Sequence, residues 1–77
     1  MNKIKQYDRV VLTQDLVGTI LKSGDVGTIV EVYNKGEAYE IEFCTLDGST
    51  LAVETVTANL VRPTSGKMVL HVRDLAA

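Results

Sequence analysis

The sequence predicts a small all-β domain in which five short strands form a barrel. Six glycines and a single proline divide the 77 residues into short runs rich in Val, Ile, Thr and Tyr. Some of these runs alternate apolar and polar side chains with the two-residue period of a β-strand. Short strands at regular spacing, separated by turn residues, are typical of small barrels and sandwiches.

Five core strands are expected in residues 1–63, and residues 64–77 form a C-terminal extension. A long loop separates the first two strands, and Pro63 ends the barrel because proline cannot donate a hydrogen bond to a neighbouring strand. The predicted strands are Tyr7–Leu12, Val26–Asn34, Glu37–Cys44, Thr50–Val56 and Leu60–Arg62.

The third predicted strand shows which side chains face the core. Its apolar residues share one parity and its glutamates the other, so the apolar set is expected inside. A two-residue turn at 35–36 would place Val32 opposite Tyr39 and Val30 opposite Ile41. Ile29 then faces outward, unless a bulge near Gly27 turns it inward, and the sequence leaves both options open.

The second hairpin is expected to close with a three-residue loop, Leu46-Asp47-Gly48, with Gly48 in a left-handed conformation. This loop pairs Phe43 with Leu51 and Ile41 with Val53. All four side chains then belong to the inner face, so the two hairpins agree on one core.

The same registers predict a row of carboxylates on the outward face. Glu31 lies opposite Glu40, Glu40 lies opposite Glu54, and Glu42 lies one step along. Like charges directly opposite one another destabilise a sheet, but water screens an exposed row. The row is therefore either a solvated face or a surface that receives a basic protein partner.

The extension carries a possible further strand at 67–73. Met68, Leu70 and Val72 fall on one side of it, and Lys67, His71 and Arg73 on the other. Such a strand adds either to an edge of its own sheet or to a second copy of the chain, and the sequence does not decide between them.

Size and composition favour self-association. A domain this short has a thin core, and such domains often gain stability from disulfides, metals or assembly. Cys44 is the single cysteine, so no disulfide forms within one chain, and a free thiol fits a reducing cytoplasm. Soft ligands are few, so we expect a homo-oligomer without metal or other cofactor.

Catalysis, membrane insertion and nucleic-acid binding are not expected. Cys44 and His71 are the only nucleophile–base pair, with no third group to orient them. No apolar run reaches the ~18–20 residues of a membrane span, and no signal-peptide pattern begins the chain. An isoelectric point near 5.2 opposes phosphate binding. Basic residues near the chain ends still leave nucleic-acid binding as the alternative function: Lys3, Lys5, Arg9 and Arg62.

Several sequence blocks resemble a known family. They are Asp8-x-Val10-x-Leu12, Lys22-x-Gly24-Asp25-x-Gly27-Thr28, Tyr39-Glu40-Ile41-Glu42-Phe43, Asp47-Gly48 and Leu60-Val61-Arg62-Pro63. Together they resemble a family of small bacterial proteins known only as a domain of unknown function, DUF4926. The resemblance implies an SH3-like barrel and a bacterial, cytoplasmic setting, sometimes in mobile gene cassettes. It implies no activity, so no functional residue is carried over.

The glycine block is also similar to the KOW motif of ribosomal and transcription-elongation proteins, where glycines permit the turn into a curved strand. That geometry serves any SH3-like barrel, so the similarity concerns the fold rather than RNA. The chain differs from the family in an unusually apolar loop and in its extra tail. Both differences suggest an added contact surface.

We therefore expect a non-catalytic protein-interaction or assembly module that self-associates. Its candidate interaction surface combines the carboxylates, the apolar loop and the tail: Glu31, Glu40, Glu42, Glu54, Val17, Ile20, Leu21, Met68, Leu70 and Val72.

Overall fold

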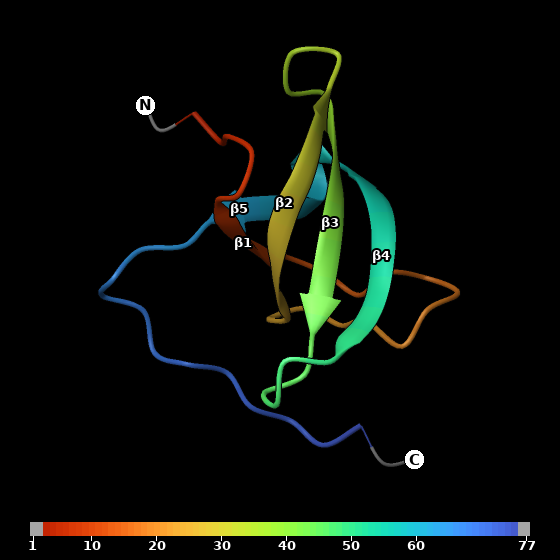
Figure 1. Cartoon of the computed structure of the whole chain (residues 1–77), viewed down its shortest axis with the longest axis vertical. Coiled ribbons are helices and arrows are strands. Elements are labelled where there is room, and N and C mark those ends of the chain that lie inside the picture. The colour runs from red at the N-terminus through yellow and green to blue at the C-terminus, as the bar shows by residue number, and fades with distance from the viewer. Residues whose placement is uncertain (1–2, 76–77) are drawn as a thin grey trace.

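The computed structural model describes residues 3–75 and consists almost entirely of antiparallel strands (Figure 1). The strands are β1 (Arg9–Leu12), β2 (Val26–Tyr33), β3 (Ala38–Cys44), β4 (Thr50–Thr57) and β5 (Val61–Pro63). One turn of 3₁₀-helix, η1 (Ala58–Leu60), joins β4 to β5. The predicted all-β architecture with five strands is confirmed.

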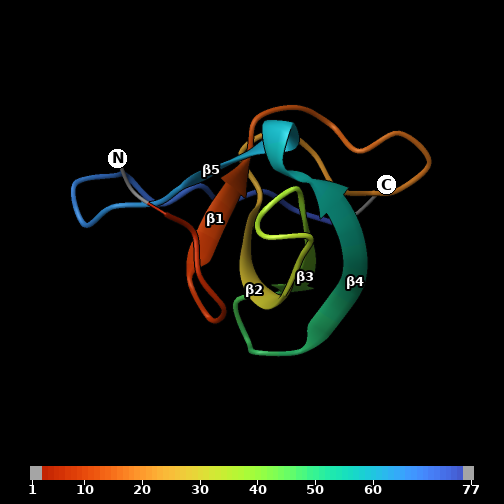
Figure 2. The same ribbon diagram turned by 90° about the horizontal axis from the view of Figure 1, so that it is seen from above.

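The five strands form a single sheet in the order β4-β3-β2-β1-β5. Strands β1 to β4 pair in sequence order: a long loop joins β1 to β2, and hairpin turns join β2 to β3 and β3 to β4. Strand β5 then pairs with the other edge of β1. Figure 2 shows that the sheet curves strongly, with β1 and β4 on opposite sides of the view and η1 between their ends. Closure of this curved sheet into a barrel stays a prediction.

The core fills the concave side of the sheet. Its side chains come from every strand and from the loop before β2, which contributes Leu21. The buried set is Val10, Leu12, Leu21, Ile29, Tyr39, Ile41, Phe43, Val56 and Val61. All of these lie before residue 64, and so do the partly buried residues that pack against them. The described part of the tail therefore adds nothing to the core cluster.

Because Gly27 has no side chain, the backbone of β2 lies closer to the apolar side chains of β3 than it could with any other residue at this position. A Cβ atom at this position would lie 2.4 Å from Cγ2 of Ile41 and 2.9 Å from Cε1 of Phe43. Real Cβ atoms do not approach neighbours this closely, so the glycine is required here by space rather than by backbone conformation.

A bulge at Val30 decides the orientation of Ile29. Next to the turn, Val32 lies opposite Tyr39 and Glu31 opposite Glu40, as predicted. The register then shifts by one, so that Ile29 rather than Val30 lies opposite Ile41. Ile29 is fully buried. The inward option is therefore correct, although the bulge lies after Ile29 and not near Gly27.

A second bulge, at Leu51, corrects the register predicted for the other hairpin. The predicted loop is present: the N–H of Thr45 donates to the carbonyl of Ser49 at 2.9 Å, and Gly48 has φ +90°. One residue further on, the register shifts, so Phe43 lies opposite Ala52 and not opposite Leu51. Ile41 consequently lies opposite Glu54 instead of Val53, and Val53 is 48% exposed.

Replacement of Gly27 by alanine tests the close approach of β2 and β3. We expect Gly27→Ala to lower the free energy of unfolding by about 1–3 kcal/mol, because the new methyl group overpacks the core. Chemical denaturation measures this change. Gly66→Ala is the matched control, since a Cβ there meets no atom within 4 Å. Equal unfolding midpoints for the two variants would contradict the argument.

Candidate interaction site

The predicted carboxylate row is shorter than expected. Glu31 and Glu40 do lie opposite one another on the outward face. The bulge at Leu51, however, places Thr55 rather than Glu54 opposite Glu40. The prediction of three glutamates across three strands is therefore wrong, and Glu54 lies on the same face as buried Ile41.

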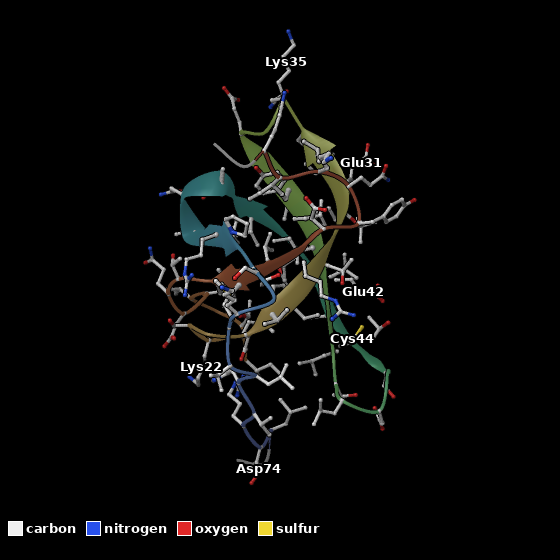
Figure 3. All side chains as sticks on the ribbon, turned by 90° about the vertical axis from the view of Figure 1, so that its left-hand side faces the viewer. Lys22, Glu31, Lys35, Glu42, Cys44 and Asp74 are labelled. Atoms are coloured by element: carbon white, nitrogen blue, oxygen red, sulfur yellow. The ribbon has the colours of Figure 1, made fainter. Side chains whose placement is uncertain are left out.

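Two carboxylates of this face already have hydrogen-bond donors from the chain itself. The hydroxyl of Tyr33 donates to Oε1 of Glu40, and this hydrogen bond raises the pKa of Tyr33 above its ordinary value. Thr50 Oγ1 donates to Oε2 of Glu42 at 2.5 Å. Figure 3 shows the labelled Glu31 and Glu42 on the same side of the molecule. This face offers an outside cation less free acceptor capacity than the sequence suggested.

The apolar loop before β2 is split between surface and core. Val17 is fully exposed and Ile20 is 54% exposed, so both fit the prediction of a surface loop. Leu21 is only 1% exposed and belongs to the core. Its assignment to an interaction surface is therefore wrong, because the loop directs this side chain into the core, where it packs with the buried residues of the strands.

The tail, defined here as residues 64–75 of the described chain, crosses the surface without forming a strand (Figure 1). Thr64 still touches β1, where its N–H donates to the carbonyl of Arg9 at 3.3 Å. Beyond Met68, the described residues make no backbone–backbone hydrogen bond. The side chains of Leu70 and Val72 are 86% and 67% exposed.

The tail is held by a cluster of polar contacts around Asp25, which we call the Asp25 clasp. Nε of Arg73 donates to Oδ1 of Asp25 at 2.8 Å, and Nη2 donates to Oδ2 at 2.7 Å. The same Nη2 also donates to the carbonyl of Ile20 at 2.6 Å. This is the two-pronged geometry in which a planar guanidinium matches a carboxylate, and it is stronger than a simple surface ion pair.

The loop before β2 prepares Asp25 for this contact. Lys22 donates its backbone N–H to Oδ2 of Asp25 at 2.8 Å, a contact within the loop that orients the carboxylate without any residue of the tail. The Asp25 side chain is only 12% exposed and that of Arg73 is 24% exposed. Limited access to water makes the pair less sensitive to screening than exposed pairs are.

His71 completes the clasp from the same side of the tail. Its Nε2 lies 3.3 Å from Oδ1 of Asp25, and its ring rests on Gly24. Gly24 has φ +94°, and a Cβ there would lie 3.2 Å from Cε1 of His71. The glycine therefore provides both the left-handed turn and the flat floor on which the ring lies.

The clasp lowers the pKa of Asp25. Burial acts in the opposite direction and would raise it, but the hydrogen bonds from Arg73 and from the Lys22 N–H, together with the charge of Arg73, outweigh that effect. The carboxylate is therefore ionised at neutral pH, where it attracts the guanidinium.

A cavity of about 480 Å³ lies between the tail and the β3–β4 hairpin. Its walls are mostly apolar and come from the body, the hairpin loop and the tail: Leu21, Phe43, Leu51, Leu46, Leu70 and Val72. Cys44, Asp25 and His71 also border it. Between residues 3 and 75, no three His, Cys, Asp or Glu side chains lie together in a way that would hold a metal ion.

Sequence reasoning missed the role of Asp25. The alternation of the tail did place His71 and Arg73 on one side, and both indeed point to the same carboxylate. The partner lies nearly fifty residues earlier in the chain. The one feature of the sequence that could have indicated this role is the Gly24-Asp25 pair, in which a carboxylate directly follows a glycine in a left-handed turn.

Lowering the pH tests the clasp. Because the pKa of Asp25 is lowered from 3.8, its ionisation stabilises the docked tail above pH 3.8, and this contribution is lost as the pH falls through the lower, folded-state pKa. Arg73, His71, Lys22 and Asp15 are the charged or titratable groups nearby. NMR measures the protonation of Asp25 through its carboxyl carbon and the release of the tail through the Arg73 Nε–H, both as a function of pH.

The Asp25→Asn variant is the control for this titration, since its clasp loses the charge and should show no acid transition at Arg73. Titration of Asp25 at or above 3.8 in the wild-type chain would contradict the clasp.

Comparison with known proteins identifies one family. No helix in the described residues has the length and apolar character needed to cross a membrane. Searches of curated proteins and of solved structures gave no match. A family described as a domain of unknown function, DUF4926, matches residues 6–63, which end where the tail begins. The chain therefore belongs to the DUF4926 family.

Proposed function

We propose that this protein is a non-catalytic protein-interaction module that self-associates through its tail. One observation carries the proposal: the tail docks on the body through His71 and Arg73, while Leu70 and Val72 stay 86% and 67% exposed at the border of the cavity. An amphipathic segment that belonged only to its own domain would bury the apolar side instead. The exposed row of Leu70 and Val72 is therefore suited to a second copy of the chain.

The tail needs further apolar side chains beside it for a stable association. Full burial of a Leu or Val side chain stabilises a complex by about 1.5–3 kcal/mol, so Leu70 and Val72 together supply a few kcal/mol. Association costs about 4–15 kcal/mol, and two side chains alone do not offset it. Leu46 and Leu75, which are 87% and 47% exposed, border the same cavity and extend the surface.

The unpaired backbone of the tail supports the same function. An extended segment with free N–H and C=O groups can add to a sheet edge of a partner. The eight-residue strand β4 forms one such edge, and Val53 lies exposed on it. A second copy thus offers both an edge and an apolar side chain to the tail.

The proposal of a non-catalytic module is supported by the surroundings of Cys44. The thiol is exposed at the end of β3. Within residues 3–75 it forms no hydrogen bond, and His71 is hydrogen-bonded to Asp25 instead. A nucleophilic cysteine needs a base within hydrogen-bond reach, and this geometry supplies none.

Light scattering after size exclusion tests self-association. We expect the full chain to form a dimer or larger assembly, and a version ending at Pro63 to be a monomer, because the row of Leu70 and Val72 is lost. The shortened chain keeps every strand and every core residue, and circular dichroism verifies that it folds.

Two charged variants locate the contact within the tail. Leu70→Glu combined with Val72→Glu should give a monomer, whereas Thr13→Glu combined with Gln14→Glu adds the same charge at exposed sites outside the tail and should assemble like the wild type. A full chain that stays monomeric over rising concentration would contradict the proposed function.

A further inference from the structure

We propose that the loop around Asp25 is a receptor for an extended, arginine-bearing peptide segment, and that the partner it takes is the tail of a second copy of this chain. In a single chain the receptor is occupied by its own tail. In an assembly, two chains exchange tails, so that Arg73 of each reaches Asp25 of the other. This mode rests on the proposed self-association, and it places the partner's tail at the Asp25 loop, which is a different docking surface from the edge of β4.

The receptor is built by the body alone. Its acceptors are the two carboxylate oxygens of Asp25 and the carbonyl of Ile20, and its floor is Gly24. The Lys22 N–H holds the carboxylate in place. All of these residues lie within the region that matches the family, whereas Arg73 lies outside it. The residues of the site and the segment that fills it thus belong to separate parts of the chain.

The three acceptors select a guanidinium rather than an ammonium. Nη2 of Arg73 donates to Oδ2 of Asp25 and to the carbonyl of Ile20, and Nε donates to Oδ1 of Asp25, all between 2.6 and 2.8 Å. A lysine ammonium is a compact point charge and does not span this arrangement with the same geometry. Arginine is therefore the residue that the site recognises.

The tail is able to leave its own body. Between residues 69 and 75 its hydrogen bonds to the body come from the side chains of His71 and Arg73, with none from its backbone. Ten extended residues from 64 to 73 span about 33–36 Å at most. The longest dimension of the molecule is 36 Å, so a released tail reaches a neighbouring copy.

Exchange conserves the clasp and adds a new interface. Because the swapped contacts are identical to those within one chain, exchange costs little in contact energy. The tethered tail competes at an effective concentration on the order of millimolar. The balance is therefore set by what the two bodies bury against each other, and the exposed Leu70, Val72 and Leu46 are the apolar side chains available for that contact.

A charge-reversal experiment separates exchange from docking within one chain. Asp25→Arg places two guanidinium groups together in one variant, and Arg73→Asp places two carboxylates together in the other, so each variant alone loses its clasp. On mixing, the intact Asp25 of one chain meets the intact Arg73 of the other, and the two substituted side chains form a second pair of opposite charges. Native mass spectrometry should show a mixed dimer that is at least tenfold more abundant than either dimer of identical chains.

The chain that carries both Asp25→Arg and Arg73→Asp is the matched control, because it restores a pair of opposite charges within one molecule and should show no preference for either single variant. Circular dichroism verifies folding of each variant. A mixture in which the two folded variants do not associate preferentially would overturn the exchange of tails.

A peptide measurement tests the receptor without reversing any charge at Asp25. The probe is a synthetic peptide of residues 64–77, and the host is the full chain carrying Arg73→Ala, whose receptor is free. Calorimetry should show binding that weakens at least tenfold when the peptide carries Arg73→Lys, or when the host also carries Asp25→Asn. Equal binding of the wild-type and Arg73→Lys peptides would overturn the receptor.

The two proposals fail in different ways. If the wild-type chain is a monomer but the peptide binds with the expected dependence on Arg73 and Asp25, the receptor stands and the proposed self-association is wrong. If the chain assembles but neither the peptide nor the charge-reversed pair shows the expected preference, self-association stands and the receptor is wrong.

Discussion

The close approach of β2 to β3 at Gly27 is the contact on which the rest of the molecule depends. With no side chain at this point, Ile41 and Phe43 fill the space against the β2 backbone and form the centre of a thin core. The bulge at Val30 then turns Ile29 into the same core. Gly24 and Asp25 lie only two or three residues before Gly27 in the chain. One short stretch of chain therefore positions both the core and the Asp25 clasp.

Much of the fold could be predicted because hairpin turns act locally. Strand positions follow from alternating side chains and turn residues, and the registers nearest both turns agree with the structure. The registers beyond Val30 and Leu51 do not, since a single extra residue reverses which side chains face inward. Nothing in the sequence around Leu51 marks the bulge, and the misplacement of Glu54 follows directly from it.

The candidate site was harder to predict because its parts are distant in the sequence. Alternation placed His71 and Arg73 on one side of the tail, but it gave no information about which surface these two side chains would meet. In the sequence Asp25 belongs to a turn motif. Its contact with the tail depends on Arg73, which lies 48 positions away. Leu21 was assigned to the surface because an apolar loop gives no periodicity from which to infer burial.

The division between body and tail determines what amino-acid substitutions in each part affect. All core residues precede residue 64, while the outward side chains of the tail make no contribution to the core cluster. Substitutions at such exposed positions usually alter folding free energy by less than about 0.5 kcal/mol. Substitutions on the outer side of the tail therefore change assembly with little effect on folding, whereas substitutions of the core side chains of the sheet change folding itself.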